Sequence, residues 1–366
     1  MSNLPKFTVG DLRRAIPKHC FERSLATSFG HLAVDLLEII VESAIMYHFI
    51  DALLWKIHPI VWLVGWTAFI FYQGVSFTAI WVLAHECGHG AFTKYEWVND
   101  LVGYILHTSL LVPYFPWKFT HASHHHYTNN LDKDEVWVPQ ITQDKEKDLK
   151  HLAERTTTLK GIVKTAIQGF FVSILGWPMY LAFNSTASKK SDNFVNHFMY
   201  STELFKGKPK WKIHASTVGM IVWSCVIASL SAFIGTGMII RLYVLPLLVC
   251  NFFLVAITYL QHTHVVVAHY KDSEWNWLLG ALCTVDRTMG PFLDRKLHLI
   301  HVTHVCHHLF SYIPFYHSRE VTEAIKPILG DLYVKDDKNF FAELWNTYKH
   351  MTVLEGNETG VHYWLK

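Results

Sequence analysis

The chain has 366 residues, of which 51% are hydrophobic and 15% aromatic, while only 17% are charged. This composition is typical of a membrane protein. The formal net charge of +2 at pH 7 gives no sign of nucleic-acid binding. Histidine is unusually frequent, with 25 residues, so its positions along the chain carry information about function.

Four segments are apolar and long enough to form helices that cross a membrane, which takes about 20 mostly apolar residues. They cover residues 32–53, 60–84, 216–239 and 242–261. The first carries Asp35, Glu38 and Glu42 near helical spacing, so these carboxylates should face the protein interior or the membrane interface. Gly235, Gly237 and Arg241 separate the last two, which predicts a helical hairpin with a short turn.

Three histidine clusters adjoin these segments, at residues 85–89, 121–125 and 304–308. Residues three and four apart on a helix lie on one face, so each cluster directs two or three imidazoles to the same side. Neutral imidazole is a preferred ligand of iron and zinc. One tetrahedral zinc ion cannot use so many histidines, whereas a site with two irons can. The candidate ligands are His85, His89, His121, His124, His125, His304, His307 and His308.

A further ligand can come from the end of the last apolar segment, which carries His262 and His264. We prefer His262, with His264 as the alternative. The six cysteines form no Cys-x-x-Cys pair and are expected to be reduced thiols. Cys87 and Cys306 lie inside histidine clusters, but they should be structural because the surrounding histidines already suffice as ligands.

The first cluster also has the pattern His-Glu-x-x-His of zinc metalloproteases, in which Glu86 would be the general base. An intramembrane zinc protease is therefore an alternative, although it would leave the other two clusters unexplained. A histidine-rich metal transporter is the alternative that is not an enzyme. A transporter should carry ionisable ligands within its membrane spans, whereas these clusters lie at or beyond the ends of the predicted spans.

Two further apolar stretches, 101–116 and 165–183, contain prolines. All histidine clusters must meet at one site, so an even number of crossings has to separate them. We therefore expect residues 101–116 to lie in the interface or to re-enter the membrane. If residues 165–183 crossed it once, the exit of the last hairpin would open on the wrong side, so this stretch should lie along the membrane. Two membrane hairpins remain.

The distribution of positive charge predicts the orientation of these hairpins. The short loops at 51–59 and 235–241 hold only Lys56 and Arg241. The opposite side holds Arg13, Arg14, Lys18, Arg23, Lys189, Lys190, Lys206, Lys208, Lys210 and Lys212. Because positive residues favour the cytosolic side, we expect the histidine clusters and both termini to be cytosolic.

Short motifs surround the clusters and the apolar segments. They are His85-Glu86-Cys87-Gly88-His89-Gly90, Trp97-Val98-Asn99-Asp100, Pro116-Trp117-Lys118, Gly176-Trp177-Pro178, Tyr259-Leu260-Gln261-His262-Thr263-His264, Thr284-Val285-Asp286-Arg287 and His307-His308-Leu309-Phe310-Ser311. With these motifs the chain resembles the membrane-bound fatty acid desaturases, especially the oleate Δ12 and methyl-end desaturases of eukaryotes. The similarity runs from about Ile16 to the C-terminal region.

This resemblance implies an all-α integral membrane protein with a single desaturase domain over residues 1–366. Two transmembrane hairpins would lie below a cytosolic helical cap that holds a di-iron site. The resemblance further implies two iron ions (Fe2+/Fe3+), bound by the histidines named above, with no catalytic residue separate from these ligands. O2 would be the co-substrate.

The resemblance also implies the reaction and its setting. A cis double bond would be inserted into an acyl chain on a membrane lipid or on coenzyme A, most simply by converting oleate to linoleate. The protein would lie in the endoplasmic reticulum membrane. The chain has no His-Pro-Gly-Gly stretch, so cytochrome b5 and its reductase are expected to be separate electron donors. ω-3 desaturation, hydroxylation and epoxidation stay open as outcomes, and so does the oligomeric state.

Overall fold

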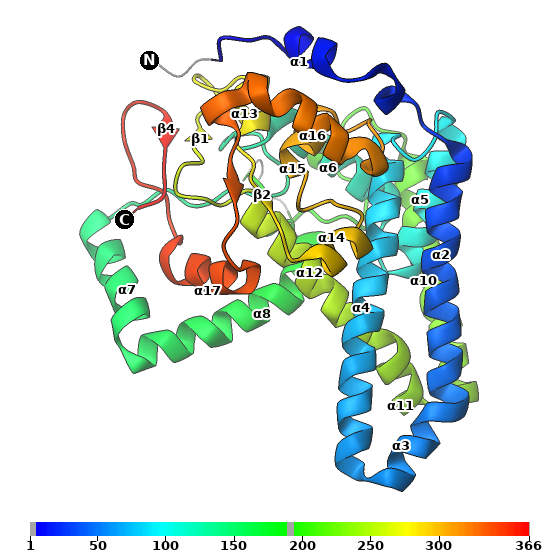
Figure 1. Cartoon of the computed structure of the whole chain (residues 1–366). Helices are drawn as coiled ribbons and strands as arrows, with labels where there is room; N and C mark the ends of the chain where they lie inside the picture. Colours follow the sequence, from blue (N-terminus) through cyan, green and yellow to red (C-terminus); the bar gives the residue numbers. More distant parts are fainter. Residues whose placement is uncertain (1–4, 189–193, 366) are drawn as a thin grey trace.

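The computed structural model describes residues 5–188 and 194–365, and within these ranges its regular secondary structure is helical apart from four two-residue strands (Figure 1). Lys189 and Lys190, which the sequence analysis placed on the cytosolic side, lie outside the described residues, as do residues 1–4 and 366.

The elements of the first half of the chain are all helical. They are α1 (Val9–Ala15), the 3-10 turn η1 (Lys18–Phe21), α2 (Leu25–Ile45), the π turn η2 (Met46–Ile50), α3 (Asp51–Ile57), α4 (Pro59–His89), α5 (Glu96–Ser109), α6 (Tyr114–Tyr127), α7 (Lys145–Thr157) and α8 (Leu159–Phe183).

The second half begins with a helical hairpin and continues into short elements. The helices are α9 (Thr202–Phe205), α10 (Lys210–Ile234), α11 (Thr236–Ile239), the π turn η3 (Ile240–Val244), α12 (Leu245–Gln261), α13 (Trp277–Leu282), α14 (Pro291–Lys296), α15 (His304–Leu309), α16 (Phe315–Leu329), η4 (Gly330–Leu332) and α17 (Phe340–His350). The strands are β1 (His269–Tyr270), β2 (Asp286–Arg287), β3 (Lys335–Asp336) and β4 (Val361–His362). β1 pairs antiparallel with β4, and β2 pairs parallel with β3.

Four of the described helices are long and apolar enough to cross a membrane. They are Pro59–His89, Leu159–Phe183, Lys210–Ile234 and Thr236–Gln261. Three correspond to predicted spans, and the turn between the last two lies at Gly235, the first of the residues expected to separate them. The reason is local, since Gly235 has a φ of 89°, which favours glycine, and η3 continues without a break into α12.

The first predicted span, 32–53, falls within the helical stretch α2–η2–α3. This stretch is not among the four selected by length and apolar composition. Two of its three carboxylates face the protein as predicted: Asp35 Oδ1 lies 3.0 Å from Lys296 Nζ, which also pairs with Glu38. His298 Nε2 lies 2.7 Å from Asp35 Oδ2. The same carboxylates that lower the mean hydropathy of α2 therefore form ion pairs that hold it against Lys296 of α14.

Helix α8 is one of the four apolar helices, although the sequence analysis expected residues 165–183 to lie along the membrane. Figure 1 shows α8 running across the direction of α2 and α4, with α7 turning back at one end. α8 packs against α12, α7 and α17. Its orientation relative to a membrane therefore stays a prediction.

A cap of short elements covers one end of the long helices, and α3 lies at the other end (Figure 1). One apolar core joins α4, α6 and α12 to α17 through side chains such as Val82, Trp117, Leu260 and Phe340. A second core lies within the cap and joins α1 and η1 to α13, α15 and α16. The two cores meet at the ends of α4 and α12, where the histidine clusters lie.

Candidate metal centre

The histidine clusters of α4, α6 and α15 meet in space. In the last turn of α4, the Nε2 atoms of His85 and His89 are 3.1 Å apart. His121 of α6 places its Nε2 atom 3.0 Å from that of His89. The Nε2 atoms of His125 and His307 are 3.2 Å apart. One ligand atom from each of these five imidazoles lies within 4.8 Å of the others, so they form a first ligand group.

A second group adjoins the first. Ligand atoms of His124, His262 and His308 lie within 4.8 Å of one another. His304 joins them, since its Nε2 atom is 3.2 Å from His262 Nε2. The rings of His125 and His308 stack with centroids 4.1 Å apart and connect the two groups. The structure therefore brings all eight histidines of the three clusters together with His262.

The choice between His262 and His264 follows from the end of α12 at Gln261. His262 is buried and its Nε2 atom is 3.3 Å from that of His124. His264 lies three residues beyond the end of the helix, and its Nε2 atom is 3.9 Å from Asp336 Oδ2. His264 belongs to neither ligand group. The arrangement favours the preferred candidate over the alternative.

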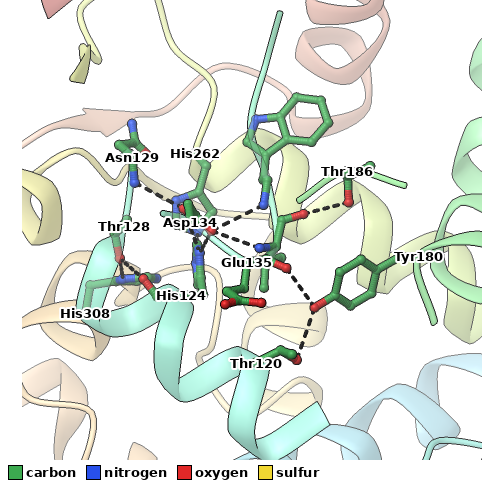
Figure 2. A network of polar contacts seen from close by, with 12 residues as sticks. Thr120, His124, Thr128, Asn129, Asp134, Glu135, Tyr180, Thr186, His262 and His308 are labelled. Atoms are coloured by element: carbon green, nitrogen blue, oxygen red, sulfur yellow. Dashed lines mark hydrogen bonds and ion pairs between the residues drawn. The ribbon is translucent and has the colours of Figure 1, made fainter. Parts of the chain in front are cut away.

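Hydrogen bonds on the outer side of the rings orient the imidazoles (Figure 2). His124 Nδ1 lies 2.8 Å from Asp134 Oδ1 and 3.0 Å from Oδ2, so it donates to this carboxylate. The Thr128 hydroxyl donates to His124 O at 2.7 Å and is therefore left to accept from His308 Nδ1 at 3.1 Å. His304 Nδ1 donates to Ile300 O at 3.2 Å. Each bond keeps the proton on Nδ1 and directs the Nε2 lone pair into the cluster.

This arrangement fits a bound cation. The Nε2 lone pairs of His124 and His304 both face His262 Nε2, and one proton on His262 could satisfy only one of them. In addition, His308 Nε2 is buried without a hydrogen-bond partner among the described residues. Converging lone pairs repel one another unless a positive ion lies between them. The donor set consists of nitrogen alone, which suits iron or zinc.

The protonation state of the rings is compatible with metal binding. Burial lowers the pKa of His304 to about 3. Burial, together with the neighbouring imidazoles, holds the pKa of His121 and His125 well below the usual value. These imidazoles are therefore neutral at pH 7, the form that binds metal ions.

Glu86 and the two cysteines of the clusters do not join the ligand groups. Glu86 Oε2 accepts a hydrogen bond from Phe315 N at 3.1 Å, and Oε1 lies 3.6 Å from His85 Nδ1, on the outer side of that ring. Cys87 and Cys306 are buried in apolar clusters of the core. This geometry does not favour a zinc protease, because Glu86 contacts the cap backbone and the outer side of the His85 ring rather than the Nε2 atoms at the centre. It agrees with the structural role expected of the cysteines.

An apolar cavity leads away from the histidines. Its narrow inner part is lined by Trp81, Ile257 and several of the clustered imidazoles. It joins a wider cavity of about 430 Å³ between α8, α12 and α17. Trp177, Tyr180 and Thr258 line both parts. The centre therefore lies at the inner end of an apolar passage, whose inner part has a volume of about 50 Å³ and whose outer part has a volume of about 430 Å³.

Two supporting residues escaped the sequence analysis. Thr128 stands four residues after His124, so helical spacing could have indicated it. Asp134 had no comparable signal, because the chain turns back after α6 to bring this carboxylate to His124. Within that turn Asp134 also accepts from Asn129 N at 3.1 Å and Val136 N at 2.9 Å.

Comparison with known proteins identifies the family of the chain and several of its relatives. Residues 60–339 match the family model of fatty acid desaturases. The chain is 41% identical to the omega-6 fatty acid desaturase, endoplasmic reticulum isozyme 1, of Glycine max, over 99% of this chain and 91% of that protein. It is 41% identical to the Delta(12)-fatty-acid desaturase of Arabidopsis thaliana, over 98% and 91%. It is 40% identical to the oleoyl-12-hydroxylase of Ricinus communis, over 97% and 88%.

Proposed function

Because the chain belongs to the fatty acid desaturase family and is therefore an oxidoreductase, we propose that it converts oleoyl chains of membrane lipids to linoleoyl chains. The observation that carries the proposal is the position of the histidine centre at the inner end of an apolar passage. The named activity of the Arabidopsis thaliana relative supports attack at the Δ12 position.

The histidines would hold two iron ions, one in each ligand group. The first ion would be bound among His85, His89, His121, His125 and His307, and the second among His124, His262, His304 and His308. When bound, the irons supply the activation of O2 that oxidation of an unactivated C–H bond requires. Asp134 and Thr128 hold the rings in the tautomer that can bind metal.

The rest of the chain positions the substrate. The passage would hold the acyl chain extended, with one methylene pair beside the centre, so that proximity selects the carbons that are oxidised. Its aromatic walls, including Trp81 and Trp177, exclude water from the reacting carbons. O2 accepts the two hydrogens removed from the chain, together with two electrons and two protons, and leaves as two water molecules. We propose that cytochrome b5 and its reductase deliver these electrons on the cytosolic face of the endoplasmic reticulum membrane.

Hydroxylation of the same chain is the second candidate function. It is favoured by the 40% identity to the oleoyl-12-hydroxylase of Ricinus communis, close to the values for the desaturases. Both reactions begin from the same bound oleoyl chain. They differ in whether a second hydrogen is removed or oxygen is transferred to the carbon.

Expression in a host that makes oleate but no linoleate, and that supplies cytochrome b5, tests both candidates. We expect linoleate, with the new double bond located by mass spectrometry. His124→Ala and His307→Ala should remove the product. His126→Ala is the matched control, because His126 is exposed beside the centre and should leave the product unchanged.

Each other result would change the assignment. Hydroxylated oleate as the main product would support the second candidate. Conversion of supplied linoleate to a triene, with oleate untouched, would indicate ω-3 desaturation. The absence of any oxidised acyl lipid, under conditions where a control desaturase is active, would contradict the proposed function.

A further inference from the structure

A second group of metal-ligating side chains lies outside the histidine centre, where the N-terminal segment meets α16. η1 carries His19 and Cys20, and the first two turns of α16 carry His317 and Glu320. One ligand atom from each of these four residues lies within 4.8 Å of the others. His19 Nε2 is 2.9 Å from Glu320 Oε2 and 3.6 Å from Cys20 Sγ. The rings of His19 and His317 meet edge to face, with centroids 5.5 Å apart.

We propose that His19, Cys20, His317 and Glu320 form a structural zinc site that fastens the N-terminal segment to α16. One thiolate, two imidazoles and one carboxylate are a complete donor set for tetrahedral zinc. With Zn–N bonds of about 2.05 Å and a Zn–S bond of about 2.3 Å, the nitrogen and sulfur ligands of a tetrahedron lie about 3.5 Å apart. The distance from His19 Nε2 to Cys20 Sγ already has this value within 0.1 Å, at 3.6 Å.

The site differs in chemistry from the histidine centre. Its donor set includes sulfur, whereas the ligand groups of the centre contain imidazole alone. His19 and Glu320 are exposed, so an ion can enter from solvent.

A metal ion here would reinforce a contact that the fold already makes. Ser24 N donates to the Tyr316 hydroxyl at 2.9 Å, and Arg13 Nη1 donates to the Tyr312 hydroxyl at 3.3 Å. Below the site, Cys20 packs in the apolar cluster that contains Val305 and Cys306 of α15. α15 carries the third histidine cluster, so the zinc site would stabilise the element that presents these histidines.

Cobalt(II) provides a selective probe, because a thiolate bound to cobalt gives a charge-transfer absorption that imidazole ligands do not give. Full-length protein loaded with iron is titrated with Co2+, and difference spectra are recorded. We expect this absorption to saturate at about one Co2+ per chain. Cys20→Ala should abolish it. Cys225→Ala is the matched control, because this cysteine is exposed on α10, away from the proposed site.

Two variants at exposed positions guard against misfolding of the buried Cys20 variant. His19→Gln and Glu320→Gln should each weaken Co2+ binding at least tenfold while the iron content stays unchanged. Zinc should raise the Tm of the wild type and not that of the His19→Gln, Glu320→Gln double variant. The proposal is wrong if the wild type gives no thiolate absorption, or if the absorption and the effect of zinc on Tm survive these substitutions.

Discussion

Within the histidine centre, the hydrogen bonds of the outward-facing ring nitrogens determine whether the inward-facing nitrogens carry a lone pair for metal binding. Asp134 holds the His124 proton on Nδ1 and is itself fixed by two backbone N–H groups. A buried carboxylate behind a histidine ligand orients the ring and increases its basicity. Asp134 is therefore a positioning residue for the proposed iron site.

Asp134→Asn tests this role. The amide keeps the size of the side chain but removes its charge, so we expect iron affinity to fall about 10- to 100-fold, with a parallel loss of product. Iron content per chain and Tm are measured together. Asp132→Asn is the matched control, since Asp132 is exposed and pairs with Lys271 away from the centre. Full iron content in Asp134→Asn would contradict the assigned role.

Substitution of Glu86 distinguishes the desaturase hypothesis from the zinc protease hypothesis. Its Oε2 atom accepts from Phe315 N, a bond that the oxygen of glutamine can also accept. We expect Glu86→Gln to retain iron and at least about a tenth of the activity, because the glutamine oxygen keeps the bond from Phe315 N and only the longer contact of Oε1 with His85 Nδ1 changes. His89→Ala should lose both. Complete inactivity of Glu86→Gln with full metal content would favour a general base.

Sequence reasoning succeeded at this scale where ligands share a helix and failed where they do not. Helical spacing indicated the pairs His85 with His89 and His304 with His308. It preferred His262 but kept His264 as an alternative, because α12 ends at Gln261, before both residues, and the following turn decides their directions. The proposed zinc ligands were not identified either, since His19 and His317 come together only through tertiary packing.

At the scale of the elements, α8 is the least certain from sequence. Its length and composition would allow it to cross a membrane. Its contacts place both ends near the cap: Tyr180 donates to Thr120 Oγ1 of α6 at 3.2 Å, and Arg155, just before α8, donates to Tyr348 O of α17 at 2.7 Å. α17 in turn packs against the segment that leads into α15, with the rings of Phe340 and His301 6.4 Å apart. We therefore predict that α8 lies along the membrane.

Cysteine labelling in sealed microsomes tests the position of α8. Lys160 lies in the first turn of α8 and Ser185 lies just after its end, and both are exposed. The variants Lys160→Cys and Ser185→Cys should both react from the cytosolic side. Cys225→Ala is the background, because Cys225 is the exposed one of the six native cysteines. Labelling of one position from the lumenal side alone would show that α8 crosses.

The same assay tests the hairpins. Lys56 lies in α3, at the end of the molecule opposite the cap (Figure 1). We expect Lys56→Cys to react from the lumenal side and Lys210→Cys, at the start of α10, from the cytosolic side. Both residues are exposed in the structure. Reaction of both from one side would contradict the two-hairpin arrangement.

At the scale of the whole molecule, the sequence predicted the class of fold and the meeting of the clusters, because apolar length and histidine spacing are local patterns. It did not predict the cavity. The walls come from separated segments, such as Val136 after α6, Trp177 on α8 and Tyr348 on α17, and no local pattern brings them together. The route of the substrate therefore emerges only from tertiary packing.

Thr258 lies where the inner and outer parts of this cavity join. We predict that Thr258→Trp fills the junction and lowers linoleate formation at least about tenfold, because a chain displaced by even about 1 Å from the centre reacts far more slowly. Thr258→Ser, which leaves the passage open, should keep most of the activity. The iron content of both variants should equal that of the wild type, since neither change replaces a metal ligand.

The two measurements together separate a blocked passage from a damaged centre. Loss of product with full iron in Thr258→Trp would support entry of the acyl chain between α8 and α12. Loss of iron in the same variant would mean that the residue acts on the centre instead. Unchanged linoleate formation with the indole side chain in place would show that the acyl chain reaches the histidines by another route.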